Sequence, residues 1–247
     1  MKISMRKVSA ITWAKARDLT DKNVIIVPIL ILGMTAGLRF LYTSMLDGQP
    51  LPDTLLGLVL NLGLSMNITM TGMFVTSAAL AQEKEKHTLR ALMTSSVNGL
   101  EFFLGSILPP LAEMMAVNVA LIPLSGLSMS VINLPLYIAV TVIASITSCI
   151  IGMIIGIFAK NQMSASTLTT PAMLLFMMVP TFGSLTPMFA KVSSLLFTGV
   201  VTDMVTSYVN GVEYSPGAFS VAVLVGEIVL AAGIFMLCYR RNGYETD

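Results

Sequence analysis

Long apolar stretches alternate with short polar segments along the whole chain. Six stretches contain enough apolar residues for a membrane-crossing helix, which needs about 20 of them. This pattern predicts an all-α membrane protein with six transmembrane helices in a single domain over 1–247. The six stretches cover roughly 24–45, 54–80, 100–125, 132–158, 165–188 and 217–239.

Two of these stretches are less regular than the others. The second contains Asn61 and Asn67 together with several threonines, serines and glycines. The fifth contains Pro171, Pro180 and Pro187, and proline removes a backbone donor and distorts the helix before it. We therefore expect the fifth helix to be kinked or broken near its outer end, with the freed backbone groups facing protein or water.

Two further segments predict helices that lie along a membrane surface. In 1–23, apolar residues and Trp13 stand among lysines and arginines, which is typical of an interfacial helix with an aromatic anchor. In the semi-apolar segment 188–216, apolar residues recur at helical spacing, which predicts an amphipathic helix at the outer interface or dipping into it. The recurring residues are Val192, Leu195, Leu196 and Val200.

The composition places the chain in the membrane class. Apolar residues make up 55% of the sequence and charged residues 11%, whereas soluble domains carry about 25% charged residues. The net charge of +1 argues against a nucleic-acid partner. Cys149 and Cys238 each sit inside an apolar run, so no disulfide framework is implied.

The distribution of lysine and arginine predicts the orientation. With six spans, both ends of the chain lie on one side, and 12 of the 14 basic residues fall on that side. Loops rich in lysine and arginine usually face the cytoplasm. We therefore expect a multi-pass protein of the cell membrane with both termini in the cytoplasm. Arg39 and Lys191 fall on the opposite side.

The segment 81–98, between the second and third stretches, concentrates charge in an otherwise apolar chain. As a helix, 81–97 has an apolar face and a charged face, so we interpret it as a short amphipathic helix displayed to the cytoplasm. A solvated loop, a membrane-surface helix and a docking element for a partner are the readings that the pattern leaves open. The apolar face holds Leu89, Leu92, Met93 and Ser96, and the other face holds Glu83, Lys86 and Arg90.

The amino-acid sequence of this segment resembles a known motif. "EKEKHTLRALMTSSVNGLEFFLG" is similar to the E-K-E-x-x-T-L-x-x-L-x-x-[ST]-P-V pattern of type-2 ABC transporter permeases, the membrane subunits of the type V exporter fold. It departs from the pattern at Ser96, where the family often has proline. That family also has six spans, an N-terminal interfacial helix and a semi-apolar outer region. The matching residues are Glu83, Lys84, Glu85, Thr88, Leu89, Leu92, Ser95 and Val97.

The resemblance implies that 81–98 is a coupling helix, which docks in a groove of a separate nucleotide-binding subunit. It further implies two ATPase copies that hold ATP and Mg²⁺, and a second permease chain in the same bilayer, identical or related. The alternatives are a bacteriocin or lantibiotic self-protection exporter subunit and a non-ABC channel or scaffold. The candidate docking residues are Glu83, Lys84, Glu85, His87, Thr88, Leu89, Arg90 and Leu92.

The sequence shows no enzyme motif. It lacks a G-x-x-x-x-G-K-[ST] phosphate loop, so this chain is not expected to bind ATP. His87 is the single histidine, and no H-E-x-x-H motif or set of cysteines and histidines with metal spacing occurs. We predict no catalytic residue, cofactor or metal in this chain. Its 19 methionines would suit a flexible path for a hydrophobic or amphipathic cargo such as a peptide, lipid or drug.

Polar residues inside the predicted spans are candidates for the translocation path. A charge at mid-bilayer costs about 2.5–3.5 kcal/mol on insertion scales, so Glu113 and Glu227 require an explanation. Either could line the path or pair with Arg39, or be protonated and hydrogen-bonded between helices. Asn67 could contact cargo or bridge helices. The spacing Gly152-x-x-x-Gly156 predicts a close approach between two helices.

Overall fold

The computed structural model describes residues 4–18, 22–46, 49–86, 99–183 and 185–242. These residues form helices and no strand, which confirms the predicted all-α class. Within them, six helices are long and apolar enough to cross a membrane, as predicted. They are α2 (Lys22–Met45), the second span Asp53–Glu85, α6 (Gly99–Ser125), α7 (Leu134–Phe158), α8 (Gln162–Thr181) and α11 (Ala218–Asn242).

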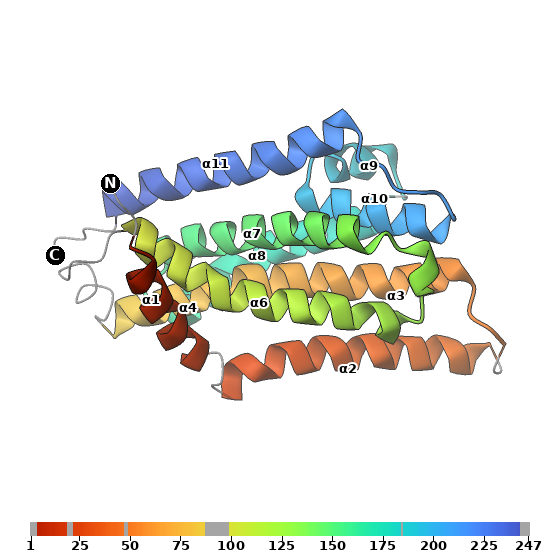
Figure 1. The fold of residues 1–247 in the computed structure, drawn as a ribbon, viewed down its shortest axis with the longest axis horizontal. Helices are drawn as coiled ribbons and strands as arrows, with labels where there is room; N and C mark the ends of the chain where they lie inside the picture. The colour runs from red at the N-terminus through yellow and green to blue at the C-terminus, as the bar shows by residue number, and fades with distance from the viewer. Residues whose placement is uncertain (1–3, 19–21, 47–48, 87–98, 184, 243–247) are drawn as a thin grey trace.

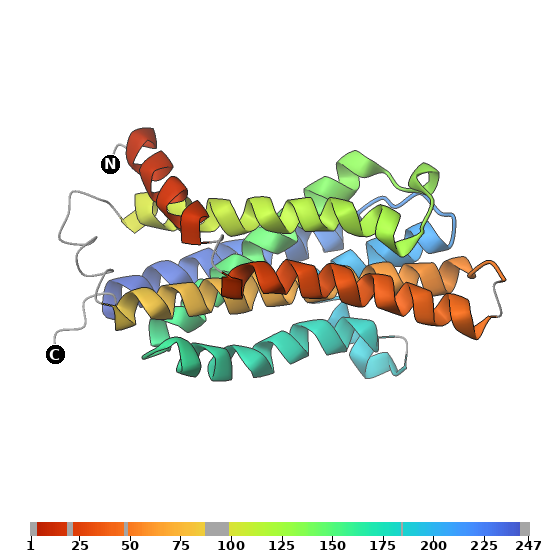
Figure 2. The same ribbon diagram turned by 90° about the horizontal axis from the view of Figure 1, so that it is seen from below.

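The spans run side by side along the long axis of the molecule (Figure 1). The second span is largely buried, and it packs against α6, α7 and α8. In contrast, α2, α8 and α11 expose most of their surface and carry many exposed large apolar side chains. Seen from below, α6 and α8 lie at opposite edges with α2 between them (Figure 2). The peripheral helices therefore present the apolar surface that contact with lipid requires.

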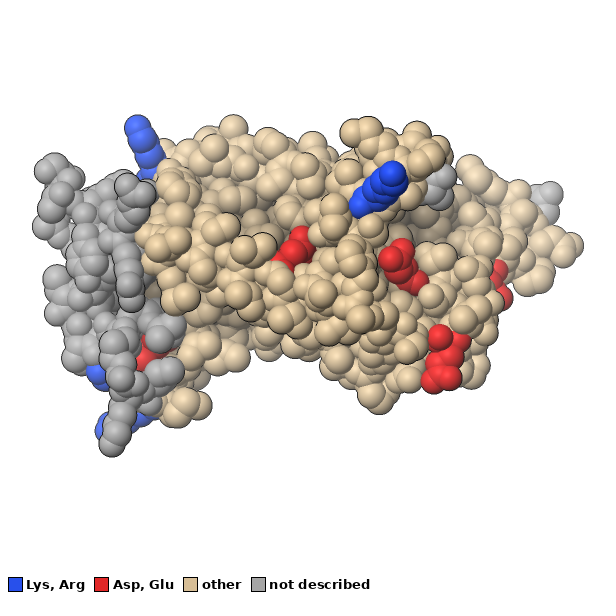
Figure 3. Space-filling view, turned by 90° about the horizontal axis from the view of Figure 1, so that it is seen from above, with Lys and Arg blue, Asp and Glu red and all other residues tan. Residues whose placement is uncertain are grey.

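The two ends of the bundle differ in charge. One end holds α1 (Met5–Asp18), the end of the second span, the turn between α7 and α8 and the end of α11 (Figure 1). On the face in Figure 3, blue atoms gather mainly at this end and red atoms lie mainly towards the other. We call it the basic end, after Arg6, Lys7, Lys15, Arg17, Lys84, Lys86 and Lys160.

The second span is a single long helix in three parts: α3 (Asp53–Met66), a π-helical stretch (Asn67–Val75) and α4 (Thr76–Glu85). Its 33 residues extend about 50 Å, whereas the hydrocarbon core of a bilayer is about 30 Å thick. The helix is therefore long enough to carry its last residues beyond the hydrocarbon. The structure differs from the expected helix over 81–98 at its start, because 81–85 continue α4. Residues 87–98 lie outside the described residues.

The outer region after the fifth span is more broken than the sequence pattern indicates. The fifth span ends at Thr181 rather than near 188, and Pro187 begins the next helix, so the expected break lies between them. Two helices, α9 (Pro187–Ser193) and α10 (Phe197–Val209), follow with a bend of 107°. The single amphipathic helix expected in 188–216 is thus a bent pair, because the apolar spacing continues through the bend and hides it.

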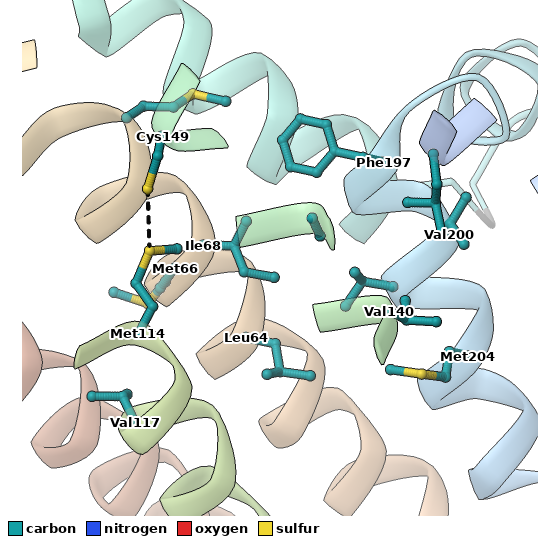
Figure 4. Packing of buried hydrophobic residues seen from close by; sticks show 14 of the residues in the cluster. Leu64, Met66, Ile68, Met114, Val117, Val140, Cys149, Phe197, Val200 and Met204 are labelled. Carbon is teal, nitrogen blue, oxygen red and sulfur yellow. Dashed lines mark hydrogen bonds between the residues drawn. The ribbon is translucent and has the colours of Figure 1, made fainter. Parts of the chain in front are cut away.

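The core is formed where α7 crosses the second span, α6 and α10 (Figure 4). Cys149 of α7 points at Met114 of α6, with 3.8 Å between the two sulfur atoms. Methionine fills irregular gaps between helices because its side chain is unbranched and soft. The buried methionines in this cluster are Met66, Met73, Met114, Met153 and Met204, so part of the predicted methionine-lined path is packed core.

Candidate functional site at the end of the second span

The end of the second span is tied to α1 by an ion pair. The ammonium of Lys15 in α1 contacts the carboxylate of Glu83 in α4, and both side chains are largely shielded from solvent. On the other side of 87–98, Glu101 lies in the first turn of α6 and accepts a hydrogen bond of 2.7 Å from the backbone nitrogen of Ser4. Lys7 lies 3.9 Å from the same carboxylate. Acidic residues on both flanks of 87–98 are therefore held by α1.

Lys84 caps the end of α7. Its Nζ donates to the carbonyl oxygen of Ile157 at 2.6 Å and to that of Ala159 at 3.1 Å. The last carbonyls of a helix have no partner inside the helix and form its negative end, so a lysine ammonium is well placed there. Lys84 thereby joins α4 to the last turn of α7.

Glu85 reaches the beginning of α8. Its Oε2 accepts a hydrogen bond of 3.3 Å from the backbone nitrogen of Gln162, the first residue of that helix. Free backbone donors at a helix start favour a negative partner. Asn161 and Ser164 form a capping box at the same place, which fixes where α8 begins. Lys84 and Glu85 thus contact the two sides of one turn, and each has the charge opposite to that of the helix terminus it contacts.

The predicted docking residues therefore separate into two groups. Glu83, Lys84 and Glu85 point into their own chain and contact α1, α7 and α8. The remaining five, namely His87, Thr88, Leu89, Arg90 and Leu92, lie outside the described residues. The signal for the first group was present in the sequence, because the Asn161 cap marks a turn that the six-span topology places on the same side as Lys84.

A cavity of about 190 Å³ lies beside α4 at the basic end. Lys15, Glu83 and Lys86 line its polar part, and Phe74, Phe102 and Met153 are among its apolar lining residues. The end of the second span is thus not packed tightly on every side. Its position depends on polar contacts to a greater extent than that of the close-packed middle of the span.

A continuous seam joins the second span to α7 below this end. The Ser148 hydroxyl donates to the carbonyl of Ile68 at 2.5 Å, and the Thr76 hydroxyl to that of Cys149 at 3.3 Å. A Cβ built on Gly152 would lie 2.5 Å from the Met73 carbonyl oxygen, so no larger residue fits without movement. The close approach predicted from the glycine spacing is confirmed, and its partner is the second span of the same chain.

The remaining polar candidates are dispersed. Asn67 is fully buried, and its amide donates to the Met114 carbonyl at 2.9 Å and to Asn118 Oδ1 at 2.8 Å, so it bridges the second span and α6. Glu113 is partly buried in α6, and its Oε2 has no hydrogen-bond partner among the described residues. Glu227 in α11 accepts a bond of 2.6 Å from the backbone nitrogen of Phe197, the first residue of α10.

Arg39 contacts neither glutamate by any hydrogen bond or ion pair within the described part of the chain. Its Nη1 donates to the carbonyl oxygens of Pro123 and Leu124, at 3.3 and 3.2 Å. These carbonyls belong to the last turn of α6, so Arg39 compensates the negative end of that helix. The suggested pairing of Arg39 with Glu113 or Glu227 is therefore not found in the structure.

Replacing Asn67 with leucine is expected to lower the free energy of unfolding by about 1–2 kcal/mol. Buried hydrogen bonds between membrane helices contribute about 0.6 kcal/mol on average and up to about 1.7 kcal/mol, and two are lost here. Thermal unfolding in lipid nanodiscs measures the change. Asn210→Leu, at an exposed position after α10, is the matched control and should leave stability unchanged. Equal stability of both variants would mean that Asn67 does not hold the two helices together.

Among the described residues, no group of three or more histidine, cysteine, aspartate or glutamate residues could hold a metal ion. The fold and the braced end of the second span define a multi-pass membrane protein. The family model described as "ABC-2 family transporter protein" matches residues 41–237, and the chain belongs to this family. It is therefore a permease component of an ABC transporter, and such permeases generally work with a separate ATPase. A search of curated proteins found no match.

Proposed function

We propose that this chain is the membrane subunit of an ATP-driven exporter and receives mechanical work from a separate ATPase through 87–98. The observation that carries this proposal is the braced end of an overlong second span. That helix is long enough to project beyond the hydrocarbon, is held by α1, α7 and α8, and is followed in the sequence by 87–98. A segment anchored in this way transmits displacement to the spans and does not absorb it.

The orientation follows from charge. The basic end carries Arg6, Lys7, Lys15, Arg17, Lys84, Lys86 and Lys160, so we place it, with both termini, in the cytoplasm. ATP is available on that side, where two ATPase copies with bound ATP and Mg²⁺ would dock. His87, Thr88, Leu89, Arg90 and Leu92 would form the contact. A cysteine at 87 that reacts only with reagent added outside sealed cells would contradict this orientation.

A second permease chain, identical or related, would complete the translocation path. The described helices of one chain pack around a core of apolar side chains (Figure 4), so the path would run between two chains. Glu113 is the best candidate for a residue on it, because the residue is only partly buried and its Oε2 is a buried oxygen with no hydrogen-bond partner among the described residues. The apolar character of the bundle suits a hydrophobic or amphipathic cargo.

Replacing both Leu89 and Leu92 with glutamate is expected to reduce the amount of ATPase that co-purifies from native membranes at least tenfold. The sequence pattern predicts both leucines on the apolar face of an amphipathic helix, and charges there would be unpaired in the centre of an interface. Quantitative mass spectrometry of the tagged complex measures the loss. Val212→Glu, at an exposed position in the opposite loop, is the matched control and should retain the ATPase. Undiminished ATPase on the double variant would exclude docking through these residues.

A further inference from the structure

We infer that Lys84 and Glu85 are positioning residues that join the end of the second span to the turn between α7 and α8. Through this connection, a displacement of α4 moves the fourth and fifth spans together with the second. The inference rests on the proposed function, because it concerns how work received at 87–98 reaches the rest of the bundle. It assigns Lys84 and Glu85 to transmission inside the chain and not to contact with the ATPase.

The contacts of the Lys84 and Glu85 side chains join α4 to both neighbouring helices. The Lys84 ammonium occupies the end of α7 with bonds of 2.6 and 3.1 Å, and the Glu85 carboxylate contacts the first nitrogen of α8 at 3.3 Å. Neighbouring residues in α4 thus hold a helix end and a helix start with opposite charges. The polar groups of Lys84 are used within the chain and are only partly accessible to a docking surface.

Close packing below these contacts joins the second span to α7 and α8. Along the seam, a Cβ on Gly152 would lie 2.8 Å from the Cα of Met73, and one on Gly156 would lie 2.9 Å from the Ser77 carbonyl oxygen. On the side of α8, the hydroxyls of Ser77 and Thr169 are 2.8 Å apart. The second span, α7 and α8 are therefore in direct contact between Met73 and Ser77, in the half of the second span next to the basic end. Such contacts favour movement as one body.

The cavity beside α4 explains why the second span needs polar contacts at its end to stay joined to α7 and α8. Apolar packing is incomplete around Phe74, Phe102 and Met153, and Glu85 itself is exposed. Because α4 lacks full support on the side of this cavity, Lys84 and Glu85 hold its last turn against α7 and α8, together with the buried cluster of Ala81, Ala159 and Ala165. Lys15 holds the same turn from the side of α1 through Glu83.

The test follows two cysteine reporters in the complete complex with its ATPase, in lipid nanodiscs. One replaces Lys86 at the end of α4 and the other replaces Met163 at the start of α8, where both side chains are exposed. The background carries Cys149→Ala and Cys238→Ser. Labelling rates with a polar maleimide are compared without nucleotide and after trapping with ATP and vanadate. In the parent protein, trapping is expected to change both rates.

In the Lys84→Met/Glu85→Ala variant, trapping should still change the rate at 86, whereas its effect at 163 should fall at least fivefold. The single variant Lys84→Arg keeps the hydrogen-bond donor. It should therefore show the same effect of trapping at 163 as the parent protein, which a merely structural defect at this position would not allow. Lys160→Met removes a lysine from the same turn and serves as the matched control. The single variants Lys84→Met and Glu85→Ala should each give an intermediate loss, which provides the test if the double variant does not fold.

The outcomes separate the inference from the proposed function. An unchanged effect of trapping at 163 in the double variant, with the effect at 86 intact, would overturn the inference and leave the proposed function in place. A parent complex without a co-purified ATPase, or without any effect of trapping at 86, would overturn the proposed function and the inference with it.

Discussion

Replacing Gly152 with alanine is expected to lower the free energy of unfolding by about 3 kcal/mol, although the change adds one methyl group. The new Cβ would lie 2.5 Å from the Met73 carbonyl oxygen and would also collide with the Thr76 hydroxyl. Backbone atoms cannot rotate away as a flexible side chain can, so α7 and the second span must separate. Overpacking of this kind typically costs about 1–3 kcal/mol and sometimes more.

Replacing Gly33 with alanine should instead raise the free energy of unfolding. No described atom lies within 4 Å of a Cβ built there, and alanine favours the helix over glycine by up to about 1 kcal/mol. Cys149 is a suitable reporter, because it is fully buried in the seam and becomes reactive when the seam opens. In a Cys238→Ser background, the temperature at which Cys149 reacts with a thiol dye measures stability. If both alanine variants gained stability, the close contact at Gly152 would be disproved.

The general form of the fold could be predicted from the sequence, because the length of each apolar stretch determines whether it spans the bilayer. The glycine spacing at Gly152 and Gly156 also predicted a close helix approach correctly. Its partner could not be predicted, since the pattern fits a second copy of the chain as well as the second span. The choice depends on how α7 is placed between its neighbours, which no local pattern encodes.

The function of the charged motif was harder to predict for a similar reason. A run of Glu83, Lys84 and Glu85 between two spans has the composition of a solvated docking surface. Whether such side chains face outwards or inwards depends on what lies beside them. In the structure, the ends of α7 and α8 meet at this point, and their unpaired backbone groups attract Lys84 and Glu85.

Glu227 shows the limit of reading a membrane carboxylate from its depth alone. The insertion cost makes it a functional candidate, and the readings are a residue on the path, a partner of Arg39 or a protonated carboxyl hydrogen-bonded between helices. The structure shows a hydrogen bond to the backbone at the start of α10, and Leu196, the residue before that helix, provides no side-chain cap there. This contact could not be predicted from the sequence, because no local signal marks the beginning of a helix at Phe197.

Replacing Glu227 with leucine is therefore expected to release the start of α10. Phe197 is fully buried, so its backbone donor would lose its carboxyl partner without access to water. Loss of a hydrogen bond to a charged group, with the donor left buried, costs about 2–3 kcal/mol. Amide exchange in 197–209 should accelerate about 30- to 140-fold, since 1.4 kcal/mol corresponds to a factor of ten.

Hydrogen exchange with mass spectrometry on the complex in nanodiscs measures this, and Glu213→Leu in the outer loop is the matched control. Glu227→Gln keeps a carbonyl acceptor without the charge and should give a smaller acceleration, of about fivefold. Exchange that is equally fast in Glu227→Gln and Glu227→Leu would show that the charge matters and not the acceptor. Exchange that stays slow in both would mean that packing against the neighbouring helices α3, α7, α8 and α11 is enough to hold α10, and would return Glu227 to the candidates for the translocation path.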